Sequence, residues 1–332
     1  MEKKKISMVE IAEISGVSTA TVSRILNKNG RYSPETEKKV MDIINKYDYK
    51  VNLNAKSLRT SRTQSIGIIV PDITNEFFAK IIRSVEIILL KKGYTLFVCD
   101  SNENCEIEEK HISSLAAKGV DGIIYISTKP DVRKIYDEYK IPVVYIDRRP
   151  ENAGTLIISD NEMGGFLATE ELIKSGCNRI VMLRDAHDYS TVLHRCKGYY
   201  EAHKKYGIKA VDRLMIASEV NYFSAHEAIL KLIKDGIPFD GVFCNNDLMA
   251  IGALHALKES KLKVPKNVKV VGFDGTYLSE ICDPPLTTIT QNTGLLGEKS
   301  VEALLNLIKH EKNDNQVFVI PVELTKRSST KK

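Results

Sequence analysis

Several features that would place this 332-residue chain in a membrane or outside the cell are missing from its sequence. It has no run of about 18 or more apolar residues, so we expect no membrane-spanning helix. Its first residues, MEKKKISMVEIAEISG, include a basic cluster but lack the apolar segment of a secretory signal. Both absences favour a cytoplasmic protein, and a content of 43% hydrophobic and 27% charged residues favours a globular fold.

The cysteines and histidines form no recognisable motif. The six cysteines are scattered, with no C-x-x-C pair and no Cys/His cluster (Cys99, Cys105, Cys177, Cys196, Cys244 and Cys282). This pattern predicts reduced thiols in the core or at the surface rather than disulfides or a metal site. His187, His194 and His203 lack metal-ligand spacing as well, so we expect them at the surface and predict no metal and no cofactor.

Motifs of enzymes are absent too. There is no G-x-S-x-G nucleophile motif and no glycine-rich phosphate loop. A glycosidase would need two carboxylates flanking one bond, but the candidates Asp147 and Asp274 fall in different halves of the chain. We therefore predict that the chain is not an enzyme.

Charge is unevenly distributed along the chain. Residues 1–65 hold 13 Lys and Arg against 7 Asp and Glu, a net charge of +6. The remainder holds 35 Lys and Arg against 36 Asp and Glu, a net charge of −1. This asymmetry predicts a small polyanion-binding part attached to a nearly neutral body.

Residues 1–50, called the head from here on, are predicted to form short helices. Apolar residues recur at helical spacing in MVEIAEISG, and Gly16 suits the left-handed position that ends a helix. Ser18 can cap a second helix, TATVSRILN, and Ser33 a third, which has Pro34 at its first position. The stretch that follows, residues 51–63, has too few apolar residues to fold alone and is predicted to be a linker.

The first two helices have the spacing of a helix-turn-helix. Ala12 provides a small residue at the crossing, and Val22 and Ile25 provide two buried anchors on the second helix. If these pack inward, three side chains of the second helix face outward and could read bases in a DNA major groove: Thr19, Ala20 and Arg24. Hydroxyl and amide side chains placed to hold phosphates are Ser7, Ser18, Thr21, Ser23 and Asn27. An ordinary pair of surface helices is the alternative, and the charge of +6 weighs against it.

Residues 64–332, called the core from here on, alternate between apolar runs and amphipathic helical patterns. IGIIV, YTLFVCD, GIIYIS and IPVVYID are the apolar runs of the first half, and the rhythm restarts near Asn178 with NRIVML. This alternation predicts βαβ units with parallel sheets buried on both faces. Two such halves predict two α/β lobes, with a ligand in the cleft between them. The predicted fold class is α/β, an all-α helix-turn-helix head followed by this two-lobed core.

Motifs along almost the whole chain resemble the lactose/galactose repressor family (LacI/GalR) of bacterial transcription factors. The matching stretches are IAEISGVSTATVSRILN, YSPETEKKV and YDYKVNLNAKSLR in the head and linker, and IGIIVPDITNEFF, VDGIIYIS, IPVVYIDRR, SDNEMGG, RCKGY, FCNNDLMAIGALHAL, VKVVGFDG, PPLTTITQ and IPVELTKRSST in the core. The resemblance implies a periplasmic-binding-protein-like core and a ligand-responsive regulator, with repression of carbohydrate-related genes as the expected role. The implied partners are double-stranded operator DNA, a small-molecule effector such as a sugar, and a second copy of the chain.

The resemblance also assigns roles to the linker. It implies a hinge helix that includes Asn52, contacts its twin through Ala55, and inserts Leu58 into the DNA minor groove. Without the resemblance, Leu58 would be interpreted as a lone exposed apolar residue in a flexible segment. Val51 departs from the family, which usually has proline there.

In the core, the resemblance implies a set of ligand-contacting side chains. Those of the first half are Phe77, Phe78 and Asp147, and those of the second half are Arg195, Asn246, Asp274 and Gln291. Carboxylates, an arginine and amides facing aromatic rings suit a polyhydroxylated ligand. Either phenylalanine could instead belong to the hydrophobic core. Asp160 and Asn161 are expected to cap a helix rather than bind ligand.

Two further classes of protein remain as alternatives. A sugar-binding protein of transport would share the core, but the basic head and the missing secretory signal weigh against it. A protein that compacts DNA without a ligand would share the head, but the cleft residues are largely intact. The final residues, TKRSSTKK, contain no leucine heptad extension, which favours a dimer over a tetramer.

Overall fold

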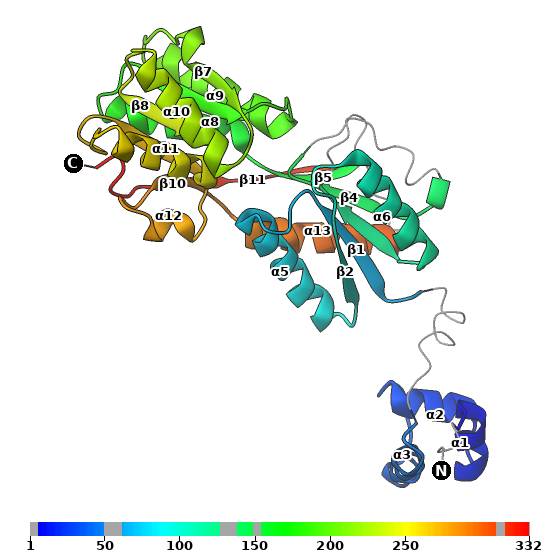
Figure 1. Ribbon diagram of the computed structural model, residues 1–332. Coiled ribbons are helices and arrows are strands. Elements are labelled where there is room, and N and C mark those ends of the chain that lie inside the picture. The colour runs from blue at the N-terminus through cyan, green and yellow to red at the C-terminus, as the bar shows by residue number, and fades with distance from the viewer. Residues whose placement is uncertain (1–5, 50–61, 127–137, 149–153, 310–315, 332) are drawn as a thin grey trace. The chain divides into compact units, whose positions relative to one another are not determined.

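The computed structural model describes residues 6–49, 62–126, 138–148, 154–309 and 316–331. The chain divides into two compact units, Met1–Thr63 and Gln64–Lys332 (Figure 1). The first contains the head, and the second is the core.

The head consists of three helices, as predicted: α1 (Met8–Ser15), α2 (Thr19–Leu26) and α3 (Pro34–Lys46). A serine caps each of them by accepting a hydrogen bond from a backbone amide of the first turn, because these amides have no partner within the helix. Gly16 ends α1 with φ at +68°, a left-handed conformation that costs glycine little. The buried side chains form one cluster: Ile11, Ala12, Val22, Ile25, Val40 and Ile44.

The first lobe of the core contains a six-stranded parallel sheet in the order β11-β5-β4-β3-β1-β2. Its strands are β1 (Ser65–Val70), β2 (Thr95–Asp100), β3 (Gly122–Tyr125), β4 (Val143–Ile146), β5 (Thr155–Ser159) and β11 (Val317–Ile320). Helices α5 (Glu76–Lys91) and α13 (Thr293–Ile308) cover one face, and α6 (Cys105–Ala117) covers the other (Figure 1). The inner strands are apolar on both faces because helices bury both of them.

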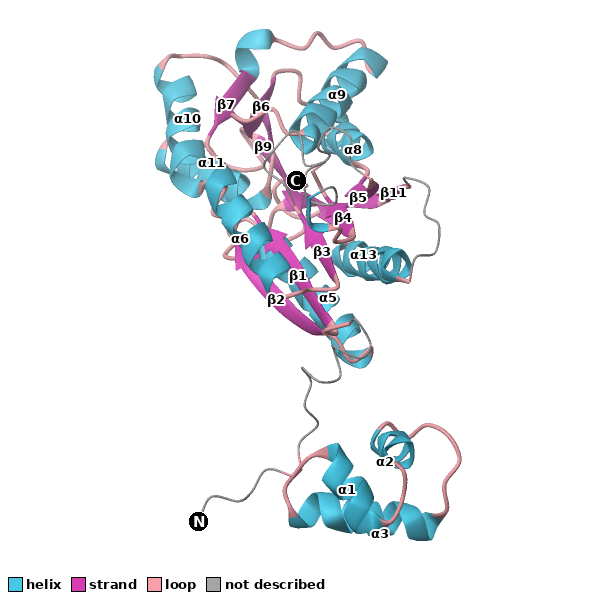
Figure 2. Ribbon diagram, turned by 90° about the vertical axis from the view of Figure 1, so that its right-hand side faces the viewer, coloured by secondary structure: helices cyan, strands magenta, loops and turns pink. Residues whose placement is uncertain are grey.

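The second lobe contains a sheet in the order β12-β10-β9-β8-β6-β7, in which only β12 pairs antiparallel. Its strands are β6 (Ile180–Asp185), β7 (Met215–Ser218), β8 (Gly241–Cys244), β9 (Lys269–Asp274), β10 (Thr287–Gln291) and β12 (Val322–Thr325). Helices α8 (Asn161–Lys174) and α9 (Ser190–Lys205) pack on one face, and α10 (Tyr222–Lys234) and α11 (Asp247–Glu259) on the other (Figure 2). A short helix, α12 (Leu278–Ile281), and a 3₁₀ turn at Asp212–Leu214 complete the lobe.

The chain passes between the lobes three times, from β5 to α8, from β10 to α13 and from β11 to β12 (Figure 1). These crossings hold the carboxyl ends of several strands of both sheets beside one shared space. The predicted fold class, a helix-turn-helix head with a two-lobed parallel α/β core, is confirmed. Among the described residues, no helix is long and apolar enough to cross a membrane.

One prediction about the surface is wrong. His203 is only 2% exposed, its ring contacts that of Tyr199, and its Nδ1 lies 2.9 Å from the carbonyl oxygen of Tyr199. Burial lowers the pKa of His203, which favours the neutral ring. This histidine is therefore part of the packing between α9 and its sheet. Asp160 caps α8 as predicted, since its carboxylate accepts a hydrogen bond from the amide of Met163. The same prediction is wrong for Asn161, which is the first residue of the helix and whose side chain bonds Ser159 and Arg195.

Helices α8 and α9 approach each other so closely that two glycines are required at their crossing. A Cβ atom on Gly198 would lie 2.1 Å from the carbonyl oxygen of Glu162, and one on Gly165 would lie 2.2 Å from that of Arg195. Such contacts are with backbone atoms, which cannot rotate away. The crossing therefore fixes the position of Arg195 one turn before Gly198.

Gly198→Ala should lower the free energy of unfolding of the core by about 3 kcal/mol, the upper end of ordinary overpacking, because backbone must move. Gly294→Ala is the matched control, since a Cβ there would meet only the side chain of Asn292 at 3.5 Å. In that helix the alanine should be neutral or stabilise by about 0.5–1 kcal/mol. Chemical denaturation measures both, and equal unfolding midpoints would refute the close approach.

Candidate ligand-binding cleft and nucleic-acid interface

In the head, α2 presents the three side chains predicted to read bases. Thr19, Ala20 and Arg24 are exposed, whereas Val22 and Ile25 of the same helix are buried. The two sets are separated because Val22 and Ile25 face the apolar cluster shared with α1 and α3, and helical spacing turns the other three away from it. The surface of α2 therefore has the shape that a major-groove helix needs, with short side chains at its N-terminal end.

Three of the five side chains predicted to hold phosphates lie at helix caps: Ser7, Ser18 and Asn27. Ser7 accepts a hydrogen bond from the amide of Glu10, and Ser18 accepts one from the amide of Thr21. Asn27 donates to the carbonyl oxygen of Ser23 at 2.7 Å. A serine that accepts a bond at its Oγ still carries a hydroxyl hydrogen, so capping and donation to an anion are compatible at Ser7. The predicted hinge residues Asn52, Ala55 and Leu58, and also Val51, lie outside the described residues.

In the core, a cavity of about 220 Å³ lies between the two lobes. The carboxyl ends of the strands open onto it, as is usual for ligand sites in α/β sheets. Its lining includes six of the seven predicted ligand residues: Phe77, Phe78, Asp147, Arg195, Asn246 and Asp274. Gln291 is buried and does not line the cavity; its amide donates to Asp274 at 2.8 Å, so it holds a lining residue.

Both phenylalanines belong to the hydrophobic core and to the cavity wall at once. Phe77 is 4% and Phe78 6% exposed, and their rings meet edge to face at 5.3 Å. They lie in the first turn of α5, where Asn75 caps the helix. The two expectations for these residues, core and ligand wall, are therefore compatible.

Two aspartates at the cavity have strained backbones. Asp147 follows β4 with φ at +65°, and Asp274 ends β9 with φ at +109°. Residues other than glycine seldom adopt these conformations, which cost energy and concentrate at functional sites. Their positions turn both carboxylates away from the sheets and into the space between the lobes.

Arg195 of α9 is held by contacts from three sides. Its Nε donates to the side-chain oxygen of Asn161 at 2.8 Å, and one terminal nitrogen donates to the carbonyl oxygen of Asn245. Its guanidinium carbon lies 3.6 Å from the centre of the Phe273 ring, a stacking contact that favours the cation. The side chains of Asn161 in α8 and Phe273 in β9, together with the main-chain carbonyl that follows β8, thus fix its orientation.

Burial dominates the electrostatics of these groups. It raises the pKa of Asp274 well above its usual value and also raises that of Asp147, although the Arg195 charge opposes both shifts. Burial likewise lowers the pKa of Arg195, against the attraction of Asp274 and Asp147. Ionised groups this deep lack sufficient compensation within the protein, which is typical of a site completed by a ligand.

Four buried polar atoms have no hydrogen-bond partner within the described part of the chain: Asp147 Oδ1, Ser159 Oγ, Asn245 Oδ1 and Gln291 Oε1. All four follow or end strands, and Asp147 and Asn245 line the cavity from opposite lobes. A buried polar atom without a partner costs roughly 1–3 kcal/mol, and most native proteins avoid it. A bound molecule that reaches the two lining atoms would remove that cost.

A set of contacts joins the two lobes at the cavity wall. Glu103 accepts two hydrogen bonds from Arg148 of the same lobe, at 2.7 and 3.1 Å, and one from the hydroxyl of Tyr189 of the second lobe at 2.8 Å. The Arg148 guanidinium also stacks on the Tyr189 ring at 3.8 Å. Burial alone would raise the pKa of Glu103, but its hydrogen bonds with Arg148 and Tyr189 and the Arg148 charge lower that pKa. The carboxylate therefore stays ionised in this contact.

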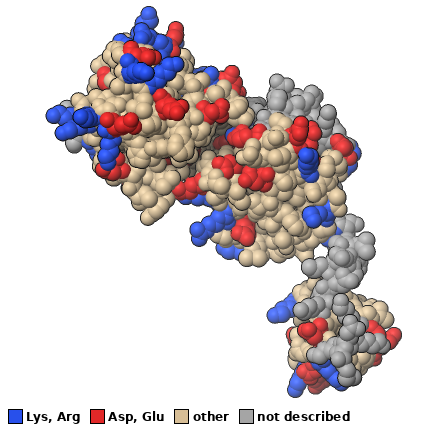
Figure 3. Space-filling model, viewed as in Figure 1, with Lys and Arg blue, Asp and Glu red and all other residues tan. Residues whose placement is uncertain are grey.

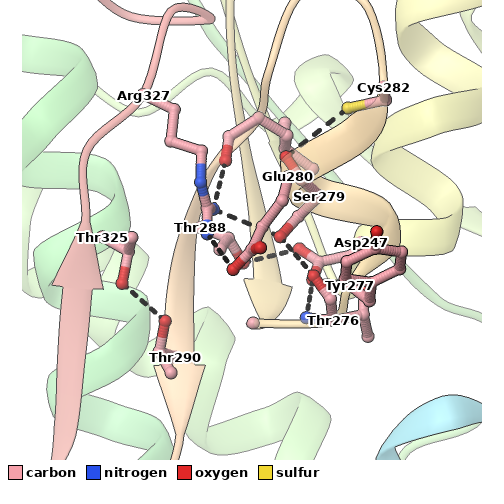
Figure 4. Close-up of polar contacts among 12 residues, drawn as sticks. Asp247, Thr276, Tyr277, Ser279, Glu280, Cys282, Thr288, Thr290, Thr325 and Arg327 are labelled. Atoms are coloured by element: carbon pink, nitrogen blue, oxygen red, sulfur yellow. Dashed lines mark hydrogen bonds and ion pairs between the residues drawn. The ribbon is translucent and has the colours of Figure 1, made fainter.

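A buried network anchors the loop that carries Asp274 (Figure 4). Asp247, at the start of α11, accepts hydrogen bonds from the amide and hydroxyl of Thr276 at 2.7 and 2.9 Å, and from the hydroxyl of Thr288. Burial raises the pKa of Asp247 to about 6 despite these bonds. Arg327 extends the network through Ser279 at 3.2 Å.

The same loop contacts the first lobe on both sides of Thr276. The Gly275 carbonyl oxygen accepts from Lys80 at 3.2 Å, and the Tyr277 amide donates to Glu76 at 2.6 Å. The loop thus joins the cavity to helix α5.

Comparison with known proteins identifies both units. The model of bacterial regulatory proteins of the lacI family matches residues 7–52, and that of periplasmic binding proteins and the sugar-binding domain of the LacI family matches residues 63–328. This protein belongs to the LacI family. It is a transcriptional regulator, with a helix-turn-helix head and a periplasmic-binding-protein-like core.

Curated LacI-family relatives match over nearly their whole length. The HTH-type transcriptional regulator RegA of Clostridium saccharobutylicum is 33% identical, with 98% of this chain and 99% of RegA covered. The HTH-type transcriptional repressor PurR of Histophilus somni (strain 2336) is 33% identical, with 97% and 98% covered. The crystal structure of the Lac repressor dimer bound to operator and the anti-inducer ONPF superposes with a TM-score of 0.87 at 26% identity, covering 98% of this chain and 99% of that one.

Several residues of this LacI-family cleft were not anticipated from the sequence. Asn245 and Arg148 directly follow the observed strands β8 and β4 by one or two residues, and Asp185 ends β6, so applying the strand-end rule to every observed strand points to them. Glu103 and Tyr189 lie in loops with no motif, and only the folded chain brings them together. Asn246 was predicted to bind ligand, and it lines the cavity while its side-chain oxygen caps α11.

Proposed function

We propose that the protein binds a pseudo-palindromic operator as a homodimer and represses carbohydrate-related genes, and that a small effector in the cleft changes its operator affinity. The observation that carries this proposal is the presence, in one chain, of a helix whose exposed side chains suit a DNA major groove and of a polar cavity with unpartnered buried atoms. The operator-bound dimer of the Lac repressor, which this chain resembles in fold, supports the dimer and the DNA partner. Because its operator would lie on chromosomal DNA, we infer a cytoplasmic location.

In this proposal residues 1–50 bind DNA, residues 51–63 form the linker and residues 64–332 bind effector and the second copy. Thr19, Ala20 and Arg24 read bases, while Ser7, Ser18, Thr21, Ser23 and Asn27 hold phosphates. Leu58 wedges the minor groove open, with Asn52 and Ala55 in the same hinge. Because the cleft polar groups serve to bind and hold a ligand, we infer no catalytic step.

The switch works through the two lobes. A ligand held by Asp147 on one lobe and by Arg195 and Asp274 on the other favours the arrangement in which both sets of contacts are made. If the dimer surfaces move with the lobes, that arrangement changes the spacing of the two hinges and so the operator affinity. The effect of ligand on DNA binding then equals the effect of DNA on ligand binding.

The surface of α2 gives the first test of this function. Arg24→Ala should relax specificity at one base pair per half-site, at a cost of about 1–3 kcal/mol there, because a bidentate contact to guanine is lost. Arg31→Ala, an exposed arginine outside α2, is the control and should at most weaken all sequences alike. Operator variants with single base substitutions measure the difference, and an unchanged base profile in Arg24→Ala would exclude direct readout.

A salt titration tests the electrostatic part. The logarithm of operator affinity should fall linearly with the logarithm of salt concentration, with a slope of about −0.9 per phosphate neutralised. The reason is the excess positive charge of residues 1–65. A flat response, or equal affinity for operator and random DNA, would contradict the proposed function.

A further inference from the structure

We propose that Asp121 is a positioning residue for DNA binding: its carboxylate holds Gln64, the first residue of the core, and so fixes the point at which the chain leaves the core toward the head. This inference rests on the proposed function, since it concerns how the core supports operator binding. It follows from the bonds of Gln64, from the strand that Gln64 precedes, and from a matching arrangement in the second lobe.

The backbone of Gln64 is held on both sides. Its amide donates to a carboxylate oxygen of Asp121 at 3.0 Å, a bond called the anchor from here on, and its carbonyl oxygen accepts from the amide of Thr95 at 2.9 Å. Asp121 directly precedes β3 and Thr95 begins β2, and these are the two strands on either side of β1 (Figure 2). Gln64 is therefore bonded to both neighbouring strands before β1 begins at Ser65.

The backbone conformation of Gln64 depends on these bonds. Its φ is +54°, in the left-handed region that residues other than glycine seldom adopt. Such a conformation persists only where surrounding contacts hold it. The bonds to Asp121 and Thr95 are contacts of this kind, so they determine the direction in which the chain enters β1.

The strand that follows is tightly packed and reaches the cavity. β1 pairs with β2 and β3, and its residues Ile66–Val70 are all buried. A Cβ atom on Gly67 would lie 2.5 Å from the side chain of Leu115, which leaves no room between β1 and α6. Just beyond the other end of β1, Asp72 and Asn75 line the cavity between the lobes. The anchor thus joins the start of the core to the same strand that leads to the cavity wall.

The second lobe contains a matching arrangement at a place where no linker begins. Asp240 directly precedes β8, and its carboxylate accepts from the amides of Asn178 and Arg179, the two residues before β6. In each lobe the aspartate is followed by a glycine and holds the start of the neighbouring strand. The arrangement is therefore part of the fold, and in the first lobe it acts on the residue that follows the unit containing the head.

The charge of the core indicates that it affects DNA binding mainly through the placement of the head. Residues 66–332 hold 35 Lys and Arg against 36 Asp and Glu. On the face shown in Figure 3, the basic side chains of the described core residues are interspersed with acidic ones and form no continuous basic surface. DNA phosphates attract clustered Lys and Arg, and the sequence concentrates its excess of these in residues 1–65.

Loss of the anchor would free at least one backbone residue between the head and the core. That residue would have to be ordered again when the protein binds its operator. Ordering one backbone residue lowers an equilibrium constant by about fivefold to thirtyfold. In the proposed dimer two chains bind one operator, so the loss occurs twice. We therefore expect Asp121→Ala to weaken operator binding by at least about tenfold.

The test uses the full chain and a DNA duplex selected from a random pool by repeated binding to the wild type. Affinities for this duplex are compared at one salt concentration, because DNA binding varies with salt. Asp121→Asn keeps a side-chain oxygen that accepts from the Gln64 amide, so it should bind within about twofold of the wild type, whereas Asp121→Ala should show the loss. Equal affinity of Asp121→Ala and the wild type would overturn the inference.

Asp240→Ala separates positioning from stability. It removes the corresponding carboxylate of the second lobe, which two backbone amides use as their acceptor. Thermal unfolding should show that both alanine variants are destabilised, but only Asp121→Ala should bind the selected duplex more weakly. If Asp240→Ala weakened DNA binding as much, the cause would be the general stability of the core and the inference would fail.

Two substitutions of Gln64 test the anchor from its other side. Gln64→Pro removes the amide hydrogen and fixes φ at about −65°, so it should weaken DNA binding as Asp121→Ala does. Gln64→Gly keeps the amide and suits the positive φ, so it should bind as the wild type does. Equal weakening by proline and glycine would mean that the Gln64 side chain, and not the anchor, supports DNA binding.

Hydrogen exchange measures the anchor without DNA. The Gln64 amide should be protected in the wild type and in Asp121→Asn, and it should exchange at least about tenfold faster in Asp121→Ala. An unprotected Gln64 amide in the wild type would overturn the inference even if operator binding were normal. A wild type that selects no DNA sequence would contradict the proposed function and the role of Asp121 together. A wild type that selects one, with an Asp121→Ala variant that binds it equally, would contradict the role of Asp121 alone.

Discussion

Replacing Arg195 with alanine should lower the free energy of unfolding of the core by about 3–5 kcal/mol, the cost of removing one partner from a buried set of charges. The substitution removes the hydrogen bonds to Asn161 and to the Asn245 carbonyl oxygen and the stacking on Phe273. It also removes the positive charge that most favours the ionised forms of Asp147 and Asp274. Ligand binding should be lost in the same variant, since Arg195 lines the cavity.

Arg184→Ala provides the matched control in the same lobe. Arg184 lies in β6 with a side chain that is 22% exposed, and it bonds the exposed Asp188 at 2.7 Å and the Asp185 carbonyl oxygen at 3.0 Å. Exposed ion pairs contribute about 0.2–1 kcal/mol, so this variant should lose far less stability than Arg195→Ala. If both variants lost similar free energies of unfolding, the buried charge of Arg195 would contribute no more to stability than an exposed ion pair does.

A double variant separates lost charge balance from lost packing. In Arg195→Ala with Asp274→Asn, the second change removes a carboxylate that the first left uncompensated. The cost of the double variant should therefore be smaller than that of Arg195→Ala alone, with a coupling of about 0.5–3 kcal/mol. Denaturant titration of the four proteins measures this coupling, and strict additivity would show that the Arg195 charge and Asp274 do not interact.

The head could be predicted almost completely from sequence because its signals are local. Ser7, Ser18 and Ser33 each cap the helix that begins at the next residue, and Gly16 ends the one before it. Every one of these interactions spans a few residues. The exposed positions on α2 then follow from helical spacing once the buried anchors are known.

The cleft was only partly predictable, and sequence separation explains why. Asp147 and Asp274 end strands whose apolar runs are visible in the sequence, so their place at the sheet edge follows from the pattern. The contact of Glu103 with Arg148 and Tyr189 spans 45 and 86 residues. No local pattern encodes it, since it depends on how the lobes close. Gln291 was expected to bind ligand, yet its amide is taken by Asp274, a detail fixed by the register of β10 beside β9.

Asp274→Asn should abolish the effector response while leaving operator affinity without effector unchanged. The asparagine keeps an oxygen that can accept from Gln291, so the local fold should persist, but the carboxylate that faces the ligand is gone. Coupling between two sites is typically about 5–150-fold, and in this variant the ratio of operator affinities with and without effector should approach one. Asp235→Asn, an exposed carboxylate after α10, should keep the wild-type ratio.

The same substitution has a predictable dependence on pH. Burial raises the pKa of Asp274 well above 3.8, so the folded protein retains a proton over a pH range in which the unfolded chain has lost it. Stability therefore falls as the pH rises from the unfolded pKa to the folded one. Asp274→Asn lacks this loss, so without ligand it should be more stable than the wild type at neutral pH.

Below the unfolded pKa the carboxyl is protonated in both states, and the difference between the two proteins should no longer vary with pH. Thermal unfolding of both proteins, from a pH below the unfolded pKa to neutral pH, measures how their stability difference changes with pH. A variant that is less stable than the wild type at neutral pH, yet has lost its effector response, would mean that the carboxylate stabilises the fold. A stable variant with an intact response would mean that the effector binds without Asp274. The expected result is a variant that is more stable than the wild type and has lost its effector response. It would show that Asp274 lowers the stability of the ligand-free core but is needed to bind the ligand, a trade-off common at functional sites.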